Sequence, residues 1–410
     1  MTELTTIVHD ASEIVVGPGT DAPLERYENA AIAVTDGRVA AVGPTGEITD
    51  EYPVENATHA IDANGRSVIP GFVDSHTHAL FAGDRSDEFA AKLGGERYQE
   101  ILAEGGGILR TVRAVREASD DELLANVLSH LDTMLAHGTT TVEIKSGYGL
   151  DTETELRMLD VIRRAGESHP VDVVPTFMGA HAVPEETDAD AYTDRVIDEQ
   201  LPAVADQGVA EFCDVFCEED VFSVEQSRRV LEAGLEHGLT PKVHAEEFVR
   251  LGGAQLAAEV GATSADHLLH ANEDDRAALA EAGVTPVLLP GTALSLGADY
   301  ADARAFLDDG GWVAVATDFN PNCYSQSMGF AIALACVGMK MTPAEALIAG
   351  THGGARALDR TDKAGTLREG MPADVAIVDA PSHVHVPYNF GVNTVETVLK
   401  GGEPVQRGQR

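Results

Sequence analysis

The sequence has 410 residues, a length that suits two or three average domains, or one α/β barrel of about 250 residues with a smaller attached unit. Its hydrophobic content of 44% is ordinary for a globular protein and sufficient for a core. Its formal net charge of −40 argues against nucleic acid or an anionic membrane surface as a partner. No apolar run approaches the roughly 18 residues of a membrane span, and the four cysteines include no CxxC pair, so neither a disulfide framework nor a thiolate zinc site is expected.

Residues 1–65 are expected to form a run of short strands. Small apolar residues alternate there with turn signals, and the Asp36-Gly37 pair is typical of a type I′ hairpin turn. Residues 362–410 show the same pattern in GTLREGMPADVAIVDAP, HVHVPYNFG and VETVLKGG. We therefore predict one small β-sandwich domain built from both termini, 1–65 plus 362–410.

Residues 66–361 follow a different pattern, in which short apolar runs alternate with amphipathic helical stretches. Two of these stretches, 120–138 and 223–238, end in a glycine that is typical of a helix C-terminus. The candidate strands are SVIPGFVDSHTH, TTTVEIKSGYG, VDVVPTFMGAH, EFCDVFCE, TPKVHAEE, TSADHLLH, TPVLLPG and WVAVATDFN. The predicted fold class is α/β, a (β/α)8 TIM-type barrel, whose chemistry sits at the C-terminal ends of the strands.

The first predicted strand ends in two histidines, His76 and His78. At a spacing of two, both side chains leave the same face of a strand, where neutral imidazoles can share one metal ion. The pair alone is a weak signal, because His383 and His385 repeat the spacing in the predicted sandwich, where we expect a structural role.

Further metal-binding residue types close later strands. His244 ends the fifth, His267 the sixth and Asp318 the eighth. Each alone has an ordinary explanation, a core histidine or a capping aspartate, but all of them at one barrel rim are not explained that way. Nitrogen and oxygen donors of this kind suit one zinc or iron ion.

This arrangement resembles the amidohydrolase superfamily, and so do the phrases VIPGFVDSHTH and GMPADVAIVD. Its binuclear members carry a carbamylated lysine at the end of strand four, where this chain has Glu218, and Lys145 belongs to strand two. The resemblance thus implies a single divalent or trivalent ion, Zn or Fe, with His267 holding its water. The implied ligands are His76, His78, His244 and Asp318.

Six ordered motifs resemble the imidazolonepropionase family: HTHALFAGDR, EIKSGYGL, FMGAHAVP, HAEEF, SADHL and TDFNP. The resemblance implies hydrolysis of 4-imidazolone-5-propanoate to N-formimidoyl-L-glutamate in histidine degradation, a small anionic substrate and a homodimer. The implied pocket residues are Arg85, Tyr148, His181, Glu247, Asn320 and Asn322. The family's glycine and hydroxyl residue after the aspartate are replaced by Asn322 and Cys323. Asparagine tolerates the positive φ that such a turn needs, but a thiol is a weaker hydrogen-bonding group, so the Cys323 contact is in doubt.

Ring opening needs a nucleophile, a polarised carbonyl and a proton for the departing nitrogen. His267 and Asp318 can accept or relay the water's proton, and Glu247 can hold or protonate a ring nitrogen; spacing does not decide which is the general base. Arg85 suits a bidentate clamp on the substrate carboxylate, its structural alternative being a salt bridge with Asp84 or Asp87.

Some patterns leave alternatives open. Tyr148 alone could be a packed loop aromatic, and GGGILRTVR is expected to be a flexible loop near the site, able to act as a lid, rather than a phosphate-binding loop. Two other functions compete: a related aminohydrolase that deaminates a heterocycle, and a non-catalytic scaffold that lost turnover. Arg85 and Tyr148 favour a carboxylate-bearing substrate over the first, and retention of every implied ligand argues against the second.

The acidic residues are spread along the whole chain, and only six residues are lysine. Concentrated salt would screen the resulting self-repulsion, since the Debye length is only about 3 Å at ~1 M. We therefore predict a saline cytoplasm, as no secretion signal is recognised in MTELTTIVHDASE; the alternative is an ordinary acidic protein.

Overall fold

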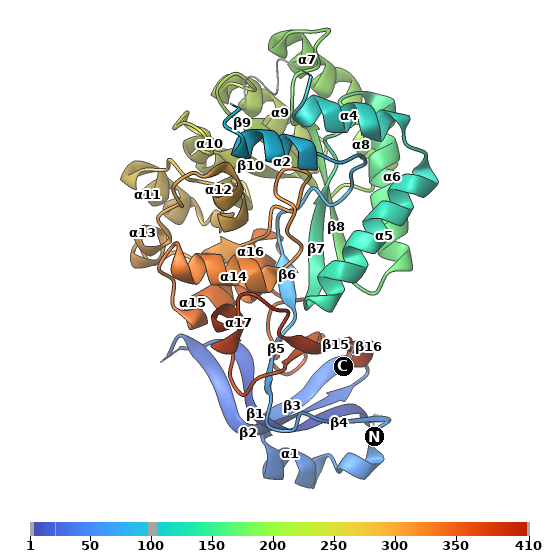
Figure 1. Cartoon of the computed structure of the whole chain (residues 1–410), viewed down its shortest axis with the longest axis vertical. Helices are drawn as coiled ribbons and strands as arrows, with labels where there is room; N and C mark the ends of the chain where they lie inside the picture. The colour runs from blue at the N-terminus through green and yellow to red at the C-terminus, as the bar shows by residue number, and fades with distance from the viewer. Residues whose placement is uncertain (1–3, 21, 97–104, 408–410) are drawn as a thin grey trace.

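The computed structural model describes residues 4–20, 22–96 and 105–407, which form a barrel and a separate mixed sheet (Figure 1). The barrel has eight parallel strands paired in chain order, and hydrogen bonds from the Asp318 and His78 amides join the two outer strands at the rim. The strands are β6 (Phe72–Asp74), β7 (Thr139–Lys145), β8 (Asp172–Ala180), β9 (Phe212–Cys217), β10 (Thr240–Ala245), β11 (Ser264–His267), β12 (Thr285–Leu288) and β13 (Ala314–Val315). The predicted (β/α)8 barrel is confirmed.

Helices cover the outside of the barrel, and several of them begin at a residue whose side chain caps the first turn. Ser119 with Glu122 and Ser223 with Gln226 form capping boxes at the starts of two of them. The helices are α2 (Ser86–Leu93), α4 (Ile108–Glu117), α5 (Asp120–Ala136), α6 (Thr152–Ser168), α7 (Ala189–Arg195), α8 (Leu201–Gln207), α9 (Val224–Glu236), α10 (Gly253–Glu259), α11 (Glu273–Ala282), α12 (Pro290–Leu296), α13 (Ala303–Asp308), α14 (Met328–Val337), α15 (Pro343–Ile348) and α16 (Gly354–Ala357). Single π-helical turns lie at Val196–Gln200 and Ala349–Gly353.

The second sheet is assembled from both ends of the chain. Its strands are β1 (Leu4–Pro18), β2 (Leu24–Thr35), β3 (Arg38–Pro44), β4 (His59–Asp62), β5 (Ser67–Pro70), β14 (Val375–Val378), β15 (Val395–Lys400) and β16 (Glu403–Arg407). Pairing runs β16-β15-β14-β5-β1-β2-β3, with β4 beside β1. The sheet folds over on itself, because Ile32 of β2 and Leu399 of β15 share one apolar core. The predicted hairpin turn is present, with φ of 50° at Asp36 and 74° at Gly37.

The first predicted barrel strand is divided between the two parts. β5 pairs with β1 and β14 of the terminal sheet, and β6 enters the barrel. Gly71 stands between them, where a Cβ would lie 2.3 Å from the Thr140 hydroxyl, so glycine leaves room for the Thr140 side chain. Figure 1 shows the terminal sheet next to the N-terminal end of β6, while α2 and α4 lie above the opposite end of the barrel.

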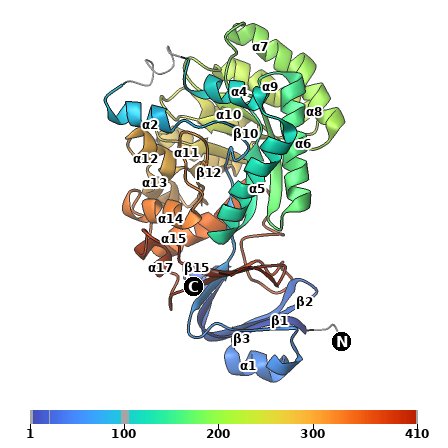
Figure 2. The ribbon, with the colours of Figure 1, turned by 45° about the vertical axis from the view of Figure 1, so that its right-hand side comes forward.

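Three segments differ from the sequence predictions. GGGILRTVR is not a free loop, because α4 begins at Ile108 directly after the glycines. HVHVP was predicted within the sandwich strands but contains the single-turn helix α17 (His385–Tyr388). A short helix, α1 (Thr45–Glu51), and a 3-10 turn, Val54–Asn56, interrupt the strands of the N-terminal segment; Figure 2 shows α1 on the outer face of the terminal sheet.

One buried carboxylate joins the two chain ends. Glu13 of β1, 3% exposed, accepts hydrogen bonds from the His383 backbone amide at 2.5 Å and from the His383 ring at 2.9 Å. It also accepts from Ser67 at 2.9 Å and from Arg26 at 2.5 Å. His383 is therefore a structural residue, as predicted.

No helix in the described part of the chain is long and apolar enough to span a membrane.

Candidate active site

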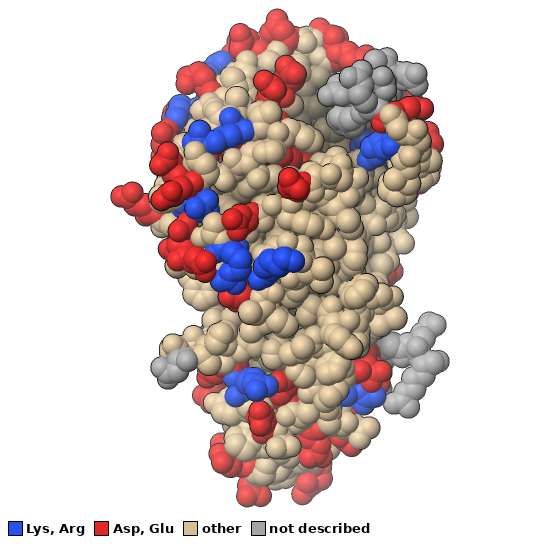
Figure 3. All heavy atoms as spheres, turned by 60° about the vertical axis from the view of Figure 1, so that its left-hand side comes forward, with Lys and Arg blue, Asp and Glu red and all other residues tan. Residues whose placement is uncertain are grey.

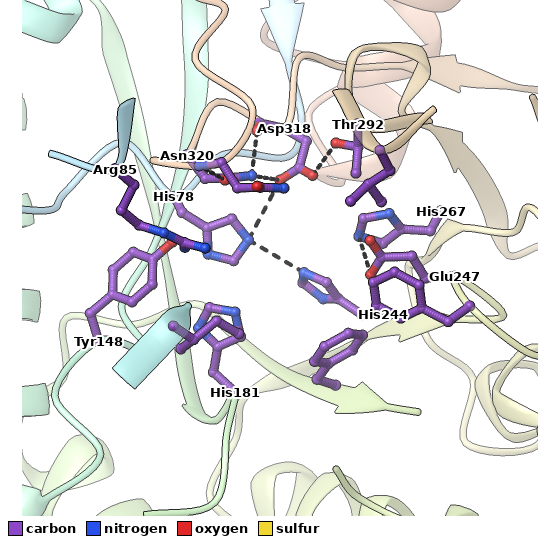
Figure 4. Close-up of a pocket in the computed structure, with 15 residues that line it drawn as sticks. His78, Arg85, Tyr148, His181, His244, Glu247, His267, Thr292, Asp318 and Asn320 are labelled. Carbon is purple, nitrogen blue, oxygen red and sulfur yellow. Dashed lines mark hydrogen bonds and ion pairs between the residues drawn. The ribbon is translucent and has the colours of Figure 1, made fainter. Parts of the chain in front are cut away.

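The C-terminal strand ends bring the predicted histidines and aspartate together (Figure 4). One ligand atom from each of His76, His78 and His244 lies within 4.8 Å of the others. The Nε2 atoms of His78 and His244 are 3.4 Å apart. Asp318 Oδ1 lies 3.5 Å from His76 Nε2 and 3.7 Å from His78 Nε2. Four residues separated by up to 242 positions thus converge on one point, as predicted from their places at strand ends.

The donor atoms have the spacing of ligands that share one ion. Two nitrogens each about 2.0–2.1 Å from a tetrahedral ion lie about 3.3 Å apart. The buried Nε2 of His76 has no hydrogen-bond partner among the described residues, although unpaired buried polar atoms are costly. The residues therefore fit one zinc or iron ion.

Buried carboxylates behind the histidines set their orientation. Asp266 Oδ2 lies 2.6 Å from His76 Nδ1, and Asp214 Oδ1 lies 3.0 Å from His244 Nδ1. Because each carboxylate accepts the Nδ1 proton, the lone pair of each ring is on Nε2, the atom that faces the site.

Two lysines inside the barrel balance these acids. Lys145 Nζ lies 2.6 Å from Asp214 and 2.8 Å from Glu143, and Lys242 Nζ lies 3.0 Å from Glu143. Burial works against the charge of Lys145, but Asp214 and Glu143 together raise its pKa above the ordinary value. Lys145 thus lies beneath the site as an ion-pair partner.

Burial lowers the pKa of three histidines at the site. Burial, reinforced by neighbouring positive groups, holds the pKa of His76, His78 and His267 well below its ordinary value. Neutral imidazole is the form that binds a metal or accepts a proton. Burial also raises the pKa of Asp318, although a hydrogen bond from Thr292 opposes that shift.

The backbone at the rim is strained. His267 has a φ of 79° and Asp318 a φ of 50°, both in the left-handed region that residues other than glycine avoid. Such a conformation costs about 1–3 kcal/mol and concentrates at functional sites. Both side chains are thereby turned toward the site at the point where their strands end.

A cavity opens from this cluster to solvent. The predicted pocket residues that line it are Arg85, Tyr148, His181, Glu247, Asn320 and Asn322. The rings of His78 and His181 stack with centroids 4.8 Å apart, and His181 Nδ1 lies 2.9 Å from the Gly147 carbonyl oxygen. Figure 4 shows Arg85 reaching in beside Tyr148 and His78, across the cavity from Glu247 and His267.

Glu247 is held against His267 at the far wall. Its carboxylate lies 3.7 Å from His267 Nε2, and its pKa is raised well above the ordinary value by burial and then by Asp318 and Glu218. Glu218 accepts from the backbone amides of Glu247 and Phe248 at 3.1 and 2.8 Å. The residue that stands in place of a strand-four lysine therefore supports this loop.

The loop after Asp318 differs from the expectation for its two unusual residues. Asn322 does not have the positive φ anticipated for it. Its backbone N–H donates to Asn320 Oδ1 at 2.7 Å, and its side-chain Oδ1 accepts from Lys92 Nζ at 2.7 Å. Cys323 does not line the cavity with the other predicted residues; its buried thiol lies 3.6 Å from the Thr317 carbonyl oxygen. Burial raises the pKa of that thiol to about 12.

The structure adds residues that sequence reasoning missed. Thr292, which hydrogen-bonds Asp318, follows the seventh strand, for which no rim residue was predicted. The same strand-end rule could have found it. The other added lining residues are apolar: Ile108, Phe216, Phe248 and Leu296.

A model of the amidohydrolase family matches residues 67–405. The chain is 70% identical to the imidazolonepropionase of Haloarcula marismortui over 406 residues, which cover 99% of this chain and 97% of that protein. The chain belongs to the imidazolonepropionase family of amidohydrolases. The imidazolonepropionase of Halobacterium salinarum strain R1 is 66% identical over 98% of each chain.

A solved structure extends the likeness of the fold beyond imidazolonepropionases. An adenosine deaminase from Xanthomonas campestris, crystallised with bound zinc, covers 98% of this chain and 92% of its own, with a TM-score of 0.74 at 19% identity. Membership of the amidohydrolases implies a metal centre, and the histidine cluster described above is suited to hold it.

Proposed function

We propose that this chain hydrolyses 4-imidazolone-5-propanoate to N-formimidoyl-L-glutamate, a step of histidine degradation. The observation that carries the proposal is one cavity that has a metal-fitting cluster at its base and a buried arginine on its wall. The substrate has the matching parts, a hydrolysable ring amide and a propionate tail. The imidazolonepropionase names of relatives 66–70% identical support it.

The proposed metal is one zinc or iron ion held by His76, His78, His244 and Asp318. When bound, such an ion supplies Lewis acidity and lowers the pKa of water toward neutrality. The residues around it handle protons and orientation.

His267 and Glu247 are the proposed proton-transfer pair. His267, kept neutral by burial, can accept the proton of the attacking water, and Asp318 can relay it. Glu247, whose raised pKa favours the protonated carboxyl, can then give a proton to the ring nitrogen as its bond to the carbonyl carbon breaks. The carbonyl carbon becomes the new carboxylate.

Arg85 is the proposed partner of the propionate carboxylate. A guanidinium can bind a carboxylate through two hydrogen bonds, and it offsets the repulsion expected from a chain with a net charge of −40. Tyr148, His181, Asn320 and Asn322 are proposed to hold the rest of the substrate, with any contribution of Cys323 made through the loop.

We also propose a homodimer working in a saline cytoplasm. The proposed domains are 1–65 plus 362–410 and 66–361, with β5 at the start of the second range paired into the terminal sheet. Figure 3 shows acidic side chains scattered over both parts of the molecule, and the excess of 68 acidic over 28 basic residues supports a salt-screened environment.

The test is a direct assay on purified protein in concentrated salt with zinc or iron supplied. Loss of ultraviolet absorbance of the imidazolone should accompany formation of formimidoylglutamate, with no ammonia released. Release of ammonia would point instead to a deaminase. A folded, metal-loaded protein that leaves the substrate intact would refute the proposal.

A further inference from the structure

Arg85 is held by one buried carboxylate, that of Glu88. The Arg85 Nε atom donates to Glu88 Oε2 at 2.8 Å, and both side chains are under a tenth exposed. The salt bridge of Arg85 with Asp84 or Asp87, considered from the sequence, is wrong. Asp84 accepts a hydrogen bond from Ser86, and the exposed Asp87 pairs with Arg110 at 2.8 Å. A buried guanidinium needs a charged partner close by, and Glu88 supplies it.

The same carboxylate reaches a second element. Glu88 Oε1 accepts from the backbone amide of Gly107 at 3.1 Å, directly before Ile108, the first residue of α4 and part of the cavity wall. Gly107 has a φ of 73°, so this amide is held in a turn conformation that glycine permits. One side chain therefore ties together α2, Arg85 and the start of α4.

We infer that Glu88 is a positioning residue that orients Arg85 for the substrate carboxylate and couples that orientation to the α4 wall of the cavity. The inference rests on the proposed function. Glu88 occupies Nε, and within residues 4–20, 22–96 and 105–407 no hydrogen bond from the two terminal nitrogens of Arg85 is found, so they can make a bidentate contact within the cavity. Glu88 does not line the cavity and acts through Arg85 and Gly107. Its Oε1 atom also lies 3.5 Å from Arg110 Nη1 on α4.

Glu88→Gln tests this inference, because an amide has one acceptor oxygen and cannot serve Arg85 Nε and the Gly107 amide together. We expect KM for imidazolonepropionate to rise about tenfold to a hundredfold, the range of a lost charge-assisted contact, while kcat stays within about twofold. Asp87→Asn is the matched control, because the exposed Asp87 shares the Arg110 contact with Glu88 but does not contact Arg85 or Gly107; it should leave KM unchanged.

The methyl ester of the substrate separates positioning from general damage. Glu88→Gln should not further raise KM for the ester, which lacks the anionic carboxylate. In an Arg85→Ala background, Glu88→Gln should add nothing, since the residue it positions is gone. Should the glutamine variant not fold, Glu88→Asp keeps the charge but is too short for both donors, and it should show the same KM pattern in weaker form.

The outcomes separate the two proposals. A wild-type protein that leaves imidazolonepropionate intact refutes the proposed function. Wild-type turnover with equal losses on acid and ester, additive effects with Arg85→Ala, or an unchanged KM refutes the role of Glu88.

Discussion

Replacing Glu13 by glutamine should destabilise the fold by about 3 kcal/mol at neutral pH. Burial alone would raise the pKa of Glu13, but the His383 contacts and Arg26 lower it from 4.5 to about 2. A depression of that size corresponds to about 3 kcal/mol of folding free energy. Both carboxylate oxygens accept hydrogen bonds, so the amide of glutamine cannot replace them.

The sign of the pH dependence follows from the lowered pKa. The contribution of Glu13 is fully present above the unfolded-state value of about 4.5 and is lost as the pH falls toward about 2. The stability difference between the wild type and Glu13→Gln should therefore be constant from pH 7 to about 5 and shrink below that. Taking the difference cancels the general effect of acid on so acidic a chain.

The assay is urea unfolding at one fixed high salt concentration across this pH range. Glu28→Gln is the matched control, because Glu28 contacts the same Arg26 at 3.2 Å but is 70% exposed. It should cost under about 0.5 kcal/mol, as exposed ion pairs do. A Glu13→Gln effect below about 1 kcal/mol, or one that does not change between pH 5 and 2, would contradict the reasoning.

Three further predictions concern the site and the surface. Arg85→Ala should raise KM for the anionic substrate at least about tenfold with a smaller change in kcat, because at least one charge-assisted hydrogen bond is lost. Steady-state kinetics measures both constants. An unchanged KM would show that the substrate carboxylate is bound by other residues. Asp266→Asn should weaken zinc binding about 10–100-fold, because the His76 ring loses the carboxylate that orients it. Competition with a chromophoric chelator measures the affinity. Unaltered affinity in a folded variant would show that Asp266 does not orient His76. Lowering NaCl from ~1 M to ~0.1 M lengthens the Debye length from about 3 to about 10 Å and should lower the melting temperature by several degrees. Sucrose at equal osmolality should not reverse this effect. A melting temperature independent of salt would contradict the role given to the net charge of −40.

The barrel and the rim cluster could be predicted because parallel strands end at one edge. That rule needs only strand order and the last polar residue of each strand, which is why His244 and Asp318 were placed together across 74 positions. Their backbone strain could not be predicted, since nothing local in SADHL or ATDFN demands a positive φ.

The ion pairs beneath the rim were missed for a different reason. Alternation indicates that Glu143 and Lys145 face the same way, but it does not tell which residues of other strands lie at their level. The pairing with Asp214 and Lys242 depends on strand register around the closed barrel. The partner of Arg85 was missed because Asp84 and Asp87 are nearer to it in sequence. Glu88 lies about one helical turn further along α2, which brings its side chain to Arg85.

The mixed sheet shared by both termini has a consequence for synthesis. β1 to β4 leave the ribosome before the barrel, whereas the residues that complete their apolar core, among them Val375, Ile377 and Leu399, arrive after it. At about 5–20 residues per second, that delay is on the order of tens of seconds. Until β14 and β15 have been made, strands β1 to β4 can pair with one another but leave an apolar face uncovered.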